Sequence, residues 1–189
     1  SRTVFLLEDL IANDGGITSF NFDFTEWSDG ILEDFSNETV LRNWVVCNSA
    51  HVIDLAFFIG GKPKDWSRYC SNPSEWHPAG MSFAGAGISD LSAMFSYRAN
   101  WDSAGRWGIE FNTKNNKYIL TPMEQLKLIK RNTVREINVE ITGEDDTLFK
   151  PGLLKMINDL LLITPSKRLC TLNDFLKNRR EFLLPITNA

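Results

Sequence analysis

The fold is decided by residues 17–27, which read ITSFNFDFTEW. Phe20, Phe22 and Phe24 alternate with polar residues, so one face of an extended segment is aromatic and the other is polar. This period of two predicts a β-strand with one buried face. We expect a helix over residues 3–13, because apolar residues recur there at helical spacing, at Val4, Leu7, Leu10 and Ile11.

A long apolar segment and several short alternating segments follow this strand. Residues 39–60 predict one amphipathic helix, which GGKP at 60–63 ends. A tight hairpin is expected at Asn115 and Asn116, which suit positive φ. Two helices should complete the chain, one over 150–162 and one from Thr171, whose hydroxyl is a plausible N-cap. The remaining strands are predicted at 65–71, 81–87, 91–101, 106–113, 124–131 and 135–142.

Strands joined by short turns imply antiparallel pairing. We therefore predict one α+β domain over residues 1–189, with a large, mostly antiparallel open β-sheet and helices on one face. The other face, with its aromatic side chains, needs a cover, so we expect subunit contact there in a homodimer or homotetramer. The chain starts SRTVFLL, without Met, and enters an apolar pattern at once, so we expect a fragment of a longer protein.

Composition excludes several classes of protein. The 189 residues carry a net charge of −4 and a pI near 5.2, without the clustered basic face expected for nucleic-acid binding. No apolar run reaches the roughly 18 residues of a membrane span, and no signal peptide is present. Cys47, Cys70 and Cys170 are scattered and odd in number, so we expect free thiols and a cytoplasmic location.

Two familiar motifs are incomplete. FAGAGISD (83–90) contains G-x-G, but Asp90 stands where a dinucleotide fingerprint has its third glycine, and a strand rather than a helix follows. We expect these glycines in a turn or bulge. A zinc site would combine Cys47 and His51 with Cys70 and His77, at spacings unusual for structural zinc. We therefore expect no metal and no cofactor bound by this chain alone.

The helix at 39–60 carries His51, one of two histidines in the chain. Asp54 lies one turn later and can accept a hydrogen bond from one ring nitrogen. The pattern by itself favours a satisfied, partly buried structural histidine over a catalytic one.

Four segments in order carry a resemblance: NWVVCNSAHVIDLAFFIGGKPK (43–64), ANWDSAGRWGIEFNT (99–113), YILTPMEQL (118–126) and FKPGLLKMI (149–157). Together they resemble the C-terminal domain of the Gfo/Idh/MocA family of NAD(P)-dependent oxidoreductases. The resemblance implies that NAD or NADP is bound by an N-terminal Rossmann domain absent from this chain. It also implies that this domain supplies the substrate site and the subunit contacts, and that the chain alone is inactive.

The family's D-x-x-x-H motif provides a histidine that acts as acid and base during hydride transfer, and His51 matches it. Cys47 stands at the position of the Asp; a cysteine is neutral at pH 7 unless activated and accepts hydrogen bonds weakly. Asn48 is therefore the expected replacement as a substrate contact. Trp44 shares the early part of this helix and is expected to line a polar, sugar-sized pocket with Asn48.

Two further residues outside the helix are candidates for substrate binding. Trp76, in the loop 71–80, is expected to stack on a sugar ring, whereas the neighbouring His77 should have a role in the loop structure. Arg106 follows a tight turn and is expected to hold a carboxylate or phosphate, with a surface salt bridge as the alternative.

Two functions from different classes follow. The leading hypothesis is the substrate-binding and oligomerisation half of an NAD(P)-dependent sugar or polyol dehydrogenase with His51 as general base. The alternative is a stand-alone, non-catalytic binding or assembly module, which Cys47 in place of Asp favours. A zinc-dependent enzyme is a distant third.

Overall fold

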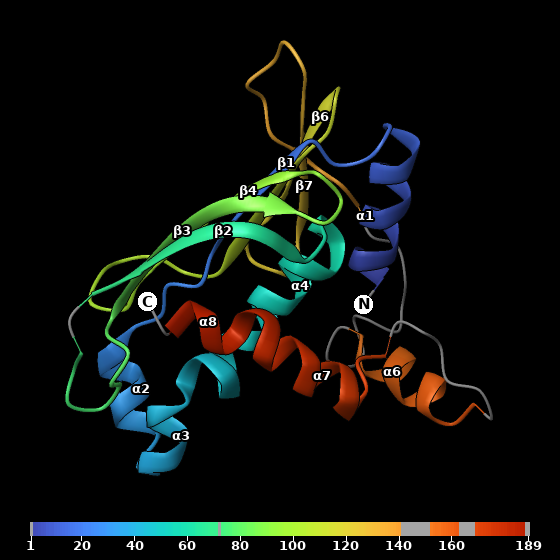
Figure 1. Ribbon diagram of the computed structural model, residues 1–189. Coiled ribbons are helices and arrows are strands. Elements are labelled where there is room, and N and C mark those ends of the chain that lie inside the picture. Colours follow the sequence, from blue (N-terminus) through green and yellow to red (C-terminus); the bar gives the residue numbers. More distant parts are fainter. Residues whose placement is uncertain (1, 72, 141–151, 163–168, 188–189) are drawn as a thin grey trace.

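The computed structural model describes residues 2–71, 73–140, 152–162 and 169–187. Within them, eight strands form one open sheet in the order β2-β3-β4-β1-β5-β6-β7-β8 (Figure 1). Only β1 and β4 pair in parallel, and all other neighbours in this sheet are antiparallel. The predicted α+β class with a mostly antiparallel open sheet is confirmed. The strands are β1 (Ser19–Asp23), β2 (Pro63–Cys70), β3 (Ser82–Ser89), β4 (Met94–Asn100), β5 (Gly108–Asn112), β6 (Asn116–Leu120), β7 (Leu126–Lys130) and β8 (Ile137–Asn138).

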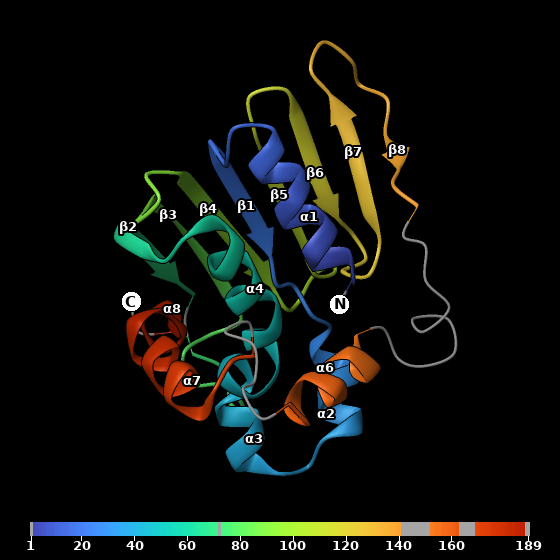
Figure 2. The same cartoon turned by 90° about the vertical axis from the view of Figure 1, so that its right-hand side faces the viewer.

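Helices cover one face of the sheet. Figure 2 shows α1 and α4 in front of the strands, while α2, α3 and the α7–α8 segment lie toward one end of the sheet. The helical elements are α1 (Arg2–Asn13), α2 (Ser28–Asp34), α3 (Glu38–Arg42), the π-helical turn η1 (Val45–Ser49), α4 (Ala50–Gly60), α6 (Leu153–Leu160), α7 (Leu172–Asn178), the π-helical turn η2 (Arg179–Leu183) and α8 (Leu184–Thr187).

The core lies between the aromatic face of β1 and helix α4. Phe20 and Phe22 meet the ring of Phe57 edge-on, with centroids 6.0 and 5.3 Å apart. Phe57 also contacts Phe182 of η2, at 4.9 Å. Burying several aromatic side chains in one layer supplies most of the apolar area that anchors α4 to the sheet.

The middle of the face without helices is polar, which corrects the expectation of an aromatic face; the exposed Tyr69, Ile88 and Met94 lie on β2, β3 and β4. Phe20 and Phe22 of β1, and Phe24 directly after it, are all buried. The opposite side of the same strands carries ion pairs, Asp23 with Arg98 and Glu110 with Lys117, each at 2.8 Å. Because side chains alternate across a strand, the helices of this chain cover the aromatic set and leave the polar set open.

Gly85 and Gly87 lie in the middle of β3, not in the turn or bulge that the sequence suggested. A Cβ at Gly85 would overlap the ring of Tyr97 on β4, and a Cβ at Gly87 would overlap Trp66 on β2. The two glycines therefore make room for large side chains from the strands on either side.

The helix expected over 39–60 is broken. Asn37 caps α3, accepting from the N–H groups of Thr39 at 3.0 Å and Val40 at 3.2 Å. Asn43, at the end of α3, leaves helical geometry, with φ −113° and ψ 25°. The π-helical turn η1 follows and leads directly into α4. Sequence periodicity predicted the helical content but missed both interruptions.

Other local predictions have mixed outcomes. Thr171 caps α7 as predicted, in a capping box with Asp174. The β5–β6 hairpin forms, but positive φ at Asn115 and Asn116 is wrong, because the non-glycine residues with positive φ in the described chain are Ser92 and Asn132. The strand expected over 135–142 is limited to β8, and residues 141–142 and 150–151 lie outside the described part.

A single carboxylate holds the β5–β6 hairpin. Asp14 accepts hydrogen bonds from Asn115 at 2.6 Å and Asn116 at 2.8 Å, and another from the hydroxyl of Thr113. Contacts from α1 therefore shape this turn, instead of the left-handed backbone that its asparagines suggested.

Candidate functional site

A cavity of about 1170 Å³ opens on the helical side of the molecule. Helix α4 forms one wall, and α1, η1, α6 and α7 contribute the others. The lining is mainly apolar with several ionisable groups, the usual composition of a small-molecule site. The polar and ionisable residues that line it are Glu8, Cys47, His51, Asp54, Lys62, Asp159, Cys170, Thr171, Asp174 and Asn178.

His51 is exposed and lies on the cavity wall. This corrects the expectation from pattern alone of a partly buried histidine. Its ring lies beside Trp107, with centroids 6.5 Å apart. The residues that follow it on α4, Val52 and Ile53, are fully buried. The imidazole thus projects from a helix whose position is set by core packing.

Asp54 lies one turn after His51 in a polar chain that ties α4 to the C-terminal helices. Its Oδ1 accepts a 2.6 Å hydrogen bond from Asn178, not the predicted bond from the His51 ring. Asn178 in turn accepts from Lys62 at 2.8 Å, and Lys62 also pairs with Glu181 at 3.0 Å. Burial raises the pKa of Asp54, while the hydrogen bond and the charges of Lys62 and His51 act in the opposite direction.

Cys47 also lines the cavity, four residues before His51, and is exposed. Position 47 carries no carboxylate, but Asp54, three residues after His51, supplies a negative charge that interacts with His51. The arrangement therefore keeps a carboxylate near the imidazole, on the C-terminal instead of the N-terminal side.

Glu26 is a buried carboxylate that the sequence gave no reason to single out. It is 2% exposed and lies just after β1. Its Oε2 accepts from Trp44 Nε1 at 2.9 Å and from Asn48 Nδ2 at 2.7 Å, and its Oε1 accepts from Ser49 Oγ at 2.7 Å. Trp44 and Asn48 thus bind Glu26 and are not among the residues that line the cavity around His51. Their predicted contact with substrate stays a prediction.

Trp76 and His77 belong to a packed loop. The ring of Trp76 stacks on Trp101, with centroids 5.5 Å apart. His77 is 1% exposed, its Nδ1 lies 2.9 Å from the carbonyl oxygen of Gly80, and burial lowers its pKa. His77 has the structural role predicted for it, and one face of Trp76 is occupied by another indole.

Arg106 lies near a second cavity, of about 550 Å³, on the open face of the sheet. Its guanidinium lies 5.3 Å from the ring of Trp27 and 5.6 Å from that of Trp107. No acidic partner is recorded for it in the described chain, so the alternative of a salt bridge is not realised. The ring of Trp107 therefore lies near both Arg106 and His51.

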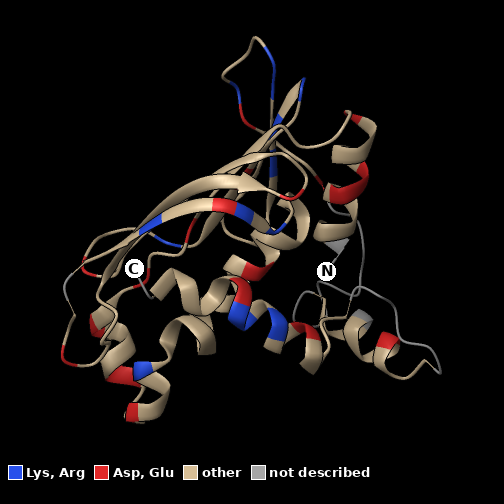
Figure 3. Cartoon of the chain, in the orientation of Figure 1, with Lys and Arg blue, Asp and Glu red and all other residues tan. Residues whose placement is uncertain are grey.

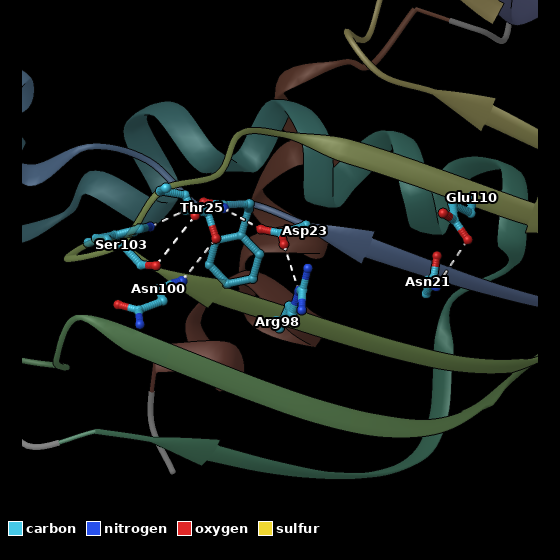
Figure 4. Close-up of polar contacts among 10 residues, drawn as sticks. Asn21, Asp23, Thr25, Arg98, Asn100, Ser103 and Glu110 are labelled. Atoms are coloured by element: carbon cyan, nitrogen blue, oxygen red, sulfur yellow. Dashed lines mark hydrogen bonds and ion pairs between the residues drawn. The ribbon is translucent and has the colours of Figure 1, made fainter. Parts of the chain in front are cut away.

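Figure 4 shows the polar contacts of β1, β4 and β5 beside this second cavity. Asn21 reaches Glu110 at 3.5 Å, and Thr25 accepts from the backbone N–H of Asn100 at 3.0 Å. Most polar groups at this surface already have partners in neighbouring strands.

The distribution of charged residues and the lengths of the helices bear on two other classes of partner, nucleic acids and membranes. Acidic and basic residues are interspersed in Figure 3, and the basic run 127–135 lies at the outer end of the sheet around the β7–β8 connection. None of the helices in the described ranges is long and apolar enough to cross a membrane. The same ranges contain no group of three or more His, Cys, Asp or Glu residues placed to hold a metal ion.

No protein-family model and no curated protein matches the chain. Several solved structures match the chain. The super-repressor mutant of Gal80p from Saccharomyces cerevisiae matches with a TM-score of 0.70 at 12% identity, covering 100% of this chain and 60% of that one. An NAD-binding oxidoreductase from Klebsiella pneumoniae gives 0.56 at 13% identity, covering 74% and 44%. Levoglucosan dehydrogenase with NADH and levoglucosan gives 0.54 at 16% identity, covering 72% and 43%.

The chain shares its fold with part of these solved proteins, which include an NAD-binding oxidoreductase. It spans about half the length of these proteins. The resemblance inferred from four segments of the sequence is thus confirmed at the level of the fold.

The G-x-G motif of residues 85–87 does not open a helix. The G-x-G of residues 85–87 is in the middle of β3, where both glycines face neighbouring side chains. A pyrophosphate site needs such glycines at a turn that opens a helix. The G-x-G of residues 85–87 therefore does not have the geometry of a pyrophosphate site.

Proposed function

We propose that this chain is the substrate-binding part of an NAD(P)-dependent sugar or polyol dehydrogenase. The fold and the sugar bound in levoglucosan dehydrogenase support the substrate class. The cofactor, NAD or NADP, would be held by a part of the protein outside the described residues.

The observation that carries the proposal is the position of His51. It is exposed on the wall of the large cavity, on a helix whose other side is fixed in the core. Oxidation of a secondary alcohol breaks the C–H bond with its electron pair and releases the hydroxyl proton. A ring nitrogen of His51 would accept that proton, because imidazole titrates near neutral pH.

Asp54 would support this step electrostatically. Its carboxylate interacts with the charge of His51, and a negative charge nearby favours the imidazolium that forms when the proton is transferred. Asn178 holds this carboxylate at 2.6 Å, so its distance from the imidazole is fixed by the C-terminal helix.

Arg106 would bind an anionic substituent of the substrate. It is exposed and held between two indole rings, and a guanidinium suits a carboxylate or a phosphate. The ring of Trp107 lies 5.6 Å from the guanidinium of Arg106 and 6.5 Å from the ring of His51, a separation that one extended substrate could span.

The test is His51→Asn in the intact protein together with its cofactor-binding part. We expect kcat to fall by about 10²-fold or more, with cofactor affinity unchanged. The matched control is His77→Asn, the same change at the buried histidine, which should keep kcat close to wild type at temperatures where it is folded. Wild-type turnover by His51→Asn would remove His51 from the reaction.

A second function, a non-catalytic binding or assembly module, is favoured by one observation. Cys47 lies exposed in the cavity where the resemblance expects an Asp. The likeness to a Gal80p repressor mutant is in keeping with such a role. Cys47→Asp discriminates between the two: it should raise kcat/KM of an enzyme, whereas a module would show no turnover with or without it.

We also propose that the open face of the sheet pairs with a second copy of the chain. Tyr69, Ile88 and Met94 are 68%, 45% and 66% exposed, and Ile88 and Met94 are paired in the register of β3 and β4. Met94→Glu should lower the mass measured by sedimentation equilibrium. The control is Val134→Glu, at a 95% exposed site on the β7–β8 connection, which should leave the mass unchanged. Monomeric wild-type protein would contradict the pairing.

A cytoplasmic location, expected from the three cysteines, stays a prediction.

A further inference from the structure

The cavity beside His51 has an apolar wall that the proposed reaction does not use. Large apolar side chains reach it from α1, α4, α6 and α7, among them Phe5, Phe58, Met156 and Phe175. Phe58 and Met156 are 47% and 44% exposed, so a large part of this wall is in contact with water. Apolar side chains that converge on one concave space are typical of a ligand site, because a ligand there removes their surface from water.

Helix α4 arranges the polar and apolar parts of the wall along its axis. His51, Leu55 and Phe58 stand at positions i, i+4 and i+7, so they follow one another along one side of the helix, and all three line the cavity. At a rise of about 1.5 Å per residue, the levels of His51 and Phe58 are separated by roughly 10 Å. A ligand that extends along this wall from His51 therefore passes from an ionisable group to an aromatic one.

Several polar groups of the cavity already have partners within the chain. Lys62, Asn178 and Asp54 form a chain of hydrogen bonds, and Thr171 and Asp174 bond each other. A free sugar presents hydroxyl groups over most of its surface, and each needs a partner when it is buried. The volume of about 1170 Å³ also exceeds the roughly 300–1,000 Å³ of sites for drug-sized ligands. A single free sugar would therefore leave much of the apolar wall in water.

We propose that the ligand of this cavity is amphipathic: a hydroxylated head beside His51 is joined to an alkyl or aryl group that packs against Phe58 and Met156. For a sugar or polyol dehydrogenase, such a substrate is an alkyl or aryl glycoside, or a polyol with an alkyl chain. The position of the hydroxyl group rests on the proposed function. The apolar part does not, and its binding can be measured without turnover.

The probes are butanediol and octanediol, each with hydroxyl groups on its first two carbons, so that they differ only in the length of the alkyl chain. Isothermal titration calorimetry measures their binding to the intact protein, together with its cofactor-binding part but without cofactor. Each fully buried methylene group tightens binding by about fourfold. Since the wall is partly open, we expect the dissociation constant of octanediol to be lower than that of butanediol by about tenfold or more.

Met156→Glu places a charge on the apolar wall. It should raise the dissociation constant of octanediol by about tenfold and that of butanediol by less than about twofold, because only the longer chain reaches this side chain. The matched control is Ile157→Glu, the same change at the next residue of α6. Ile157 is 42% exposed but is not among the described residues that line the cavity, so binding of both diols should stay at wild-type values.

The outcomes separate this inference from the proposed function. Equal affinities for the two diols, or no binding of either, would overturn the amphipathic ligand and leave the apolar wall as a contact for another protein segment. Octanediol binding that Met156→Glu leaves unchanged, or that Ile157→Glu weakens equally, would overturn it as well. Preferential binding of octanediol, combined with full turnover by His51→Asn, would keep the amphipathic ligand and overturn the dehydrogenase assignment. Turnover of a free sugar that depends on His51, combined with equal affinities for the diols, would do the reverse.

Discussion

Phe57 fixes the helix that presents His51, and its replacement gives a direct test of that arrangement. The side chain is 1% exposed and closed in by aromatic rings. The ring centroids lie 4.9 to 6.0 Å away, in Phe20, Phe22, Phe95 and Phe182. Phe57→Ala removes the buried ring and leaves a void that these neighbours cannot fill. The free energy of unfolding should fall by about 3–5 kcal/mol. For a chain of 189 residues this corresponds to a fall in Tm of about 6–20 °C.

The adjacent Phe58 is a control of the same residue type on the same helix. It is 47% exposed and lines the cavity, so about half of its surface is already in water. Phe58→Ala opens toward solvent and creates no closed void. We expect a loss of about 1 kcal/mol, which is half the transfer free energy of a buried phenylalanine.

Urea unfolding, followed by tryptophan fluorescence and far-UV circular dichroism, measures both variants against wild type. Coincident transitions from the two probes would establish that the comparison is two-state. Equal losses at the two positions, or a loss below about 1 kcal/mol for Phe57→Ala, would refute the packing of α4 on the sheet described above.

Three further predictions concern single contacts. Thr171→Ala removes the hydroxyl of the capping box with Asp174 and should lower the free energy of unfolding by about 1 kcal/mol, whereas Thr171→Ser should restore it; both are read from urea midpoints. Gly85→Ala forces a methyl group into the ring of Tyr97 and should cost about 1–3 kcal/mol, so an unchanged Tm would contradict this account of β3. Burial raises the pKa of Asp54, so the folded protein binds its proton more tightly than the unfolded chain, and this carboxyl costs stability as pH rises through the raised value. Asp54→Asn should therefore be more stable than wild type at pH 7 and lose that advantage toward pH 3.8, the ordinary pKa of the carboxyl; a urea midpoint at pH 7 no higher than wild type would argue against it.

Much of the fold was predictable because its determinants are local. The alternation of β1 can be seen in the sequence, and Phe20, Phe22 and the following Phe24 all lie in the core. The cap at Thr171 depends on Asp174, three positions later, so the local sequence is enough to predict it. Predictions that failed locally, such as positive φ at Asn115, were overridden by a partner 101 residues earlier, Asp14.

The site was predictable only in part. Resemblance and helical spacing selected His51, and the structure places it on a cavity wall. Its exposure follows from the buried face of α4, where Val52, Ile53 and Phe57 pack into the core and leave position 51 on the other side. The interruption before α4 was not predictable, because its residues Trp44 and Ser49 donate to Glu26, a carboxylate 18 to 23 residues away and in a different element.

The sequence by itself determined the elements: which segments are strands, which are helices, and which side of β1 is apolar. These follow from the spacing of side chains along the chain and need no knowledge of distant partners. Tertiary structure decided the partner of Asp54, the π-helical interruption before α4 and the ion pairs on the open face. Each of these depends on which remote groups meet when the chain folds, and hydrogen bonds made by a buried carboxylate can change the local geometry of a helix.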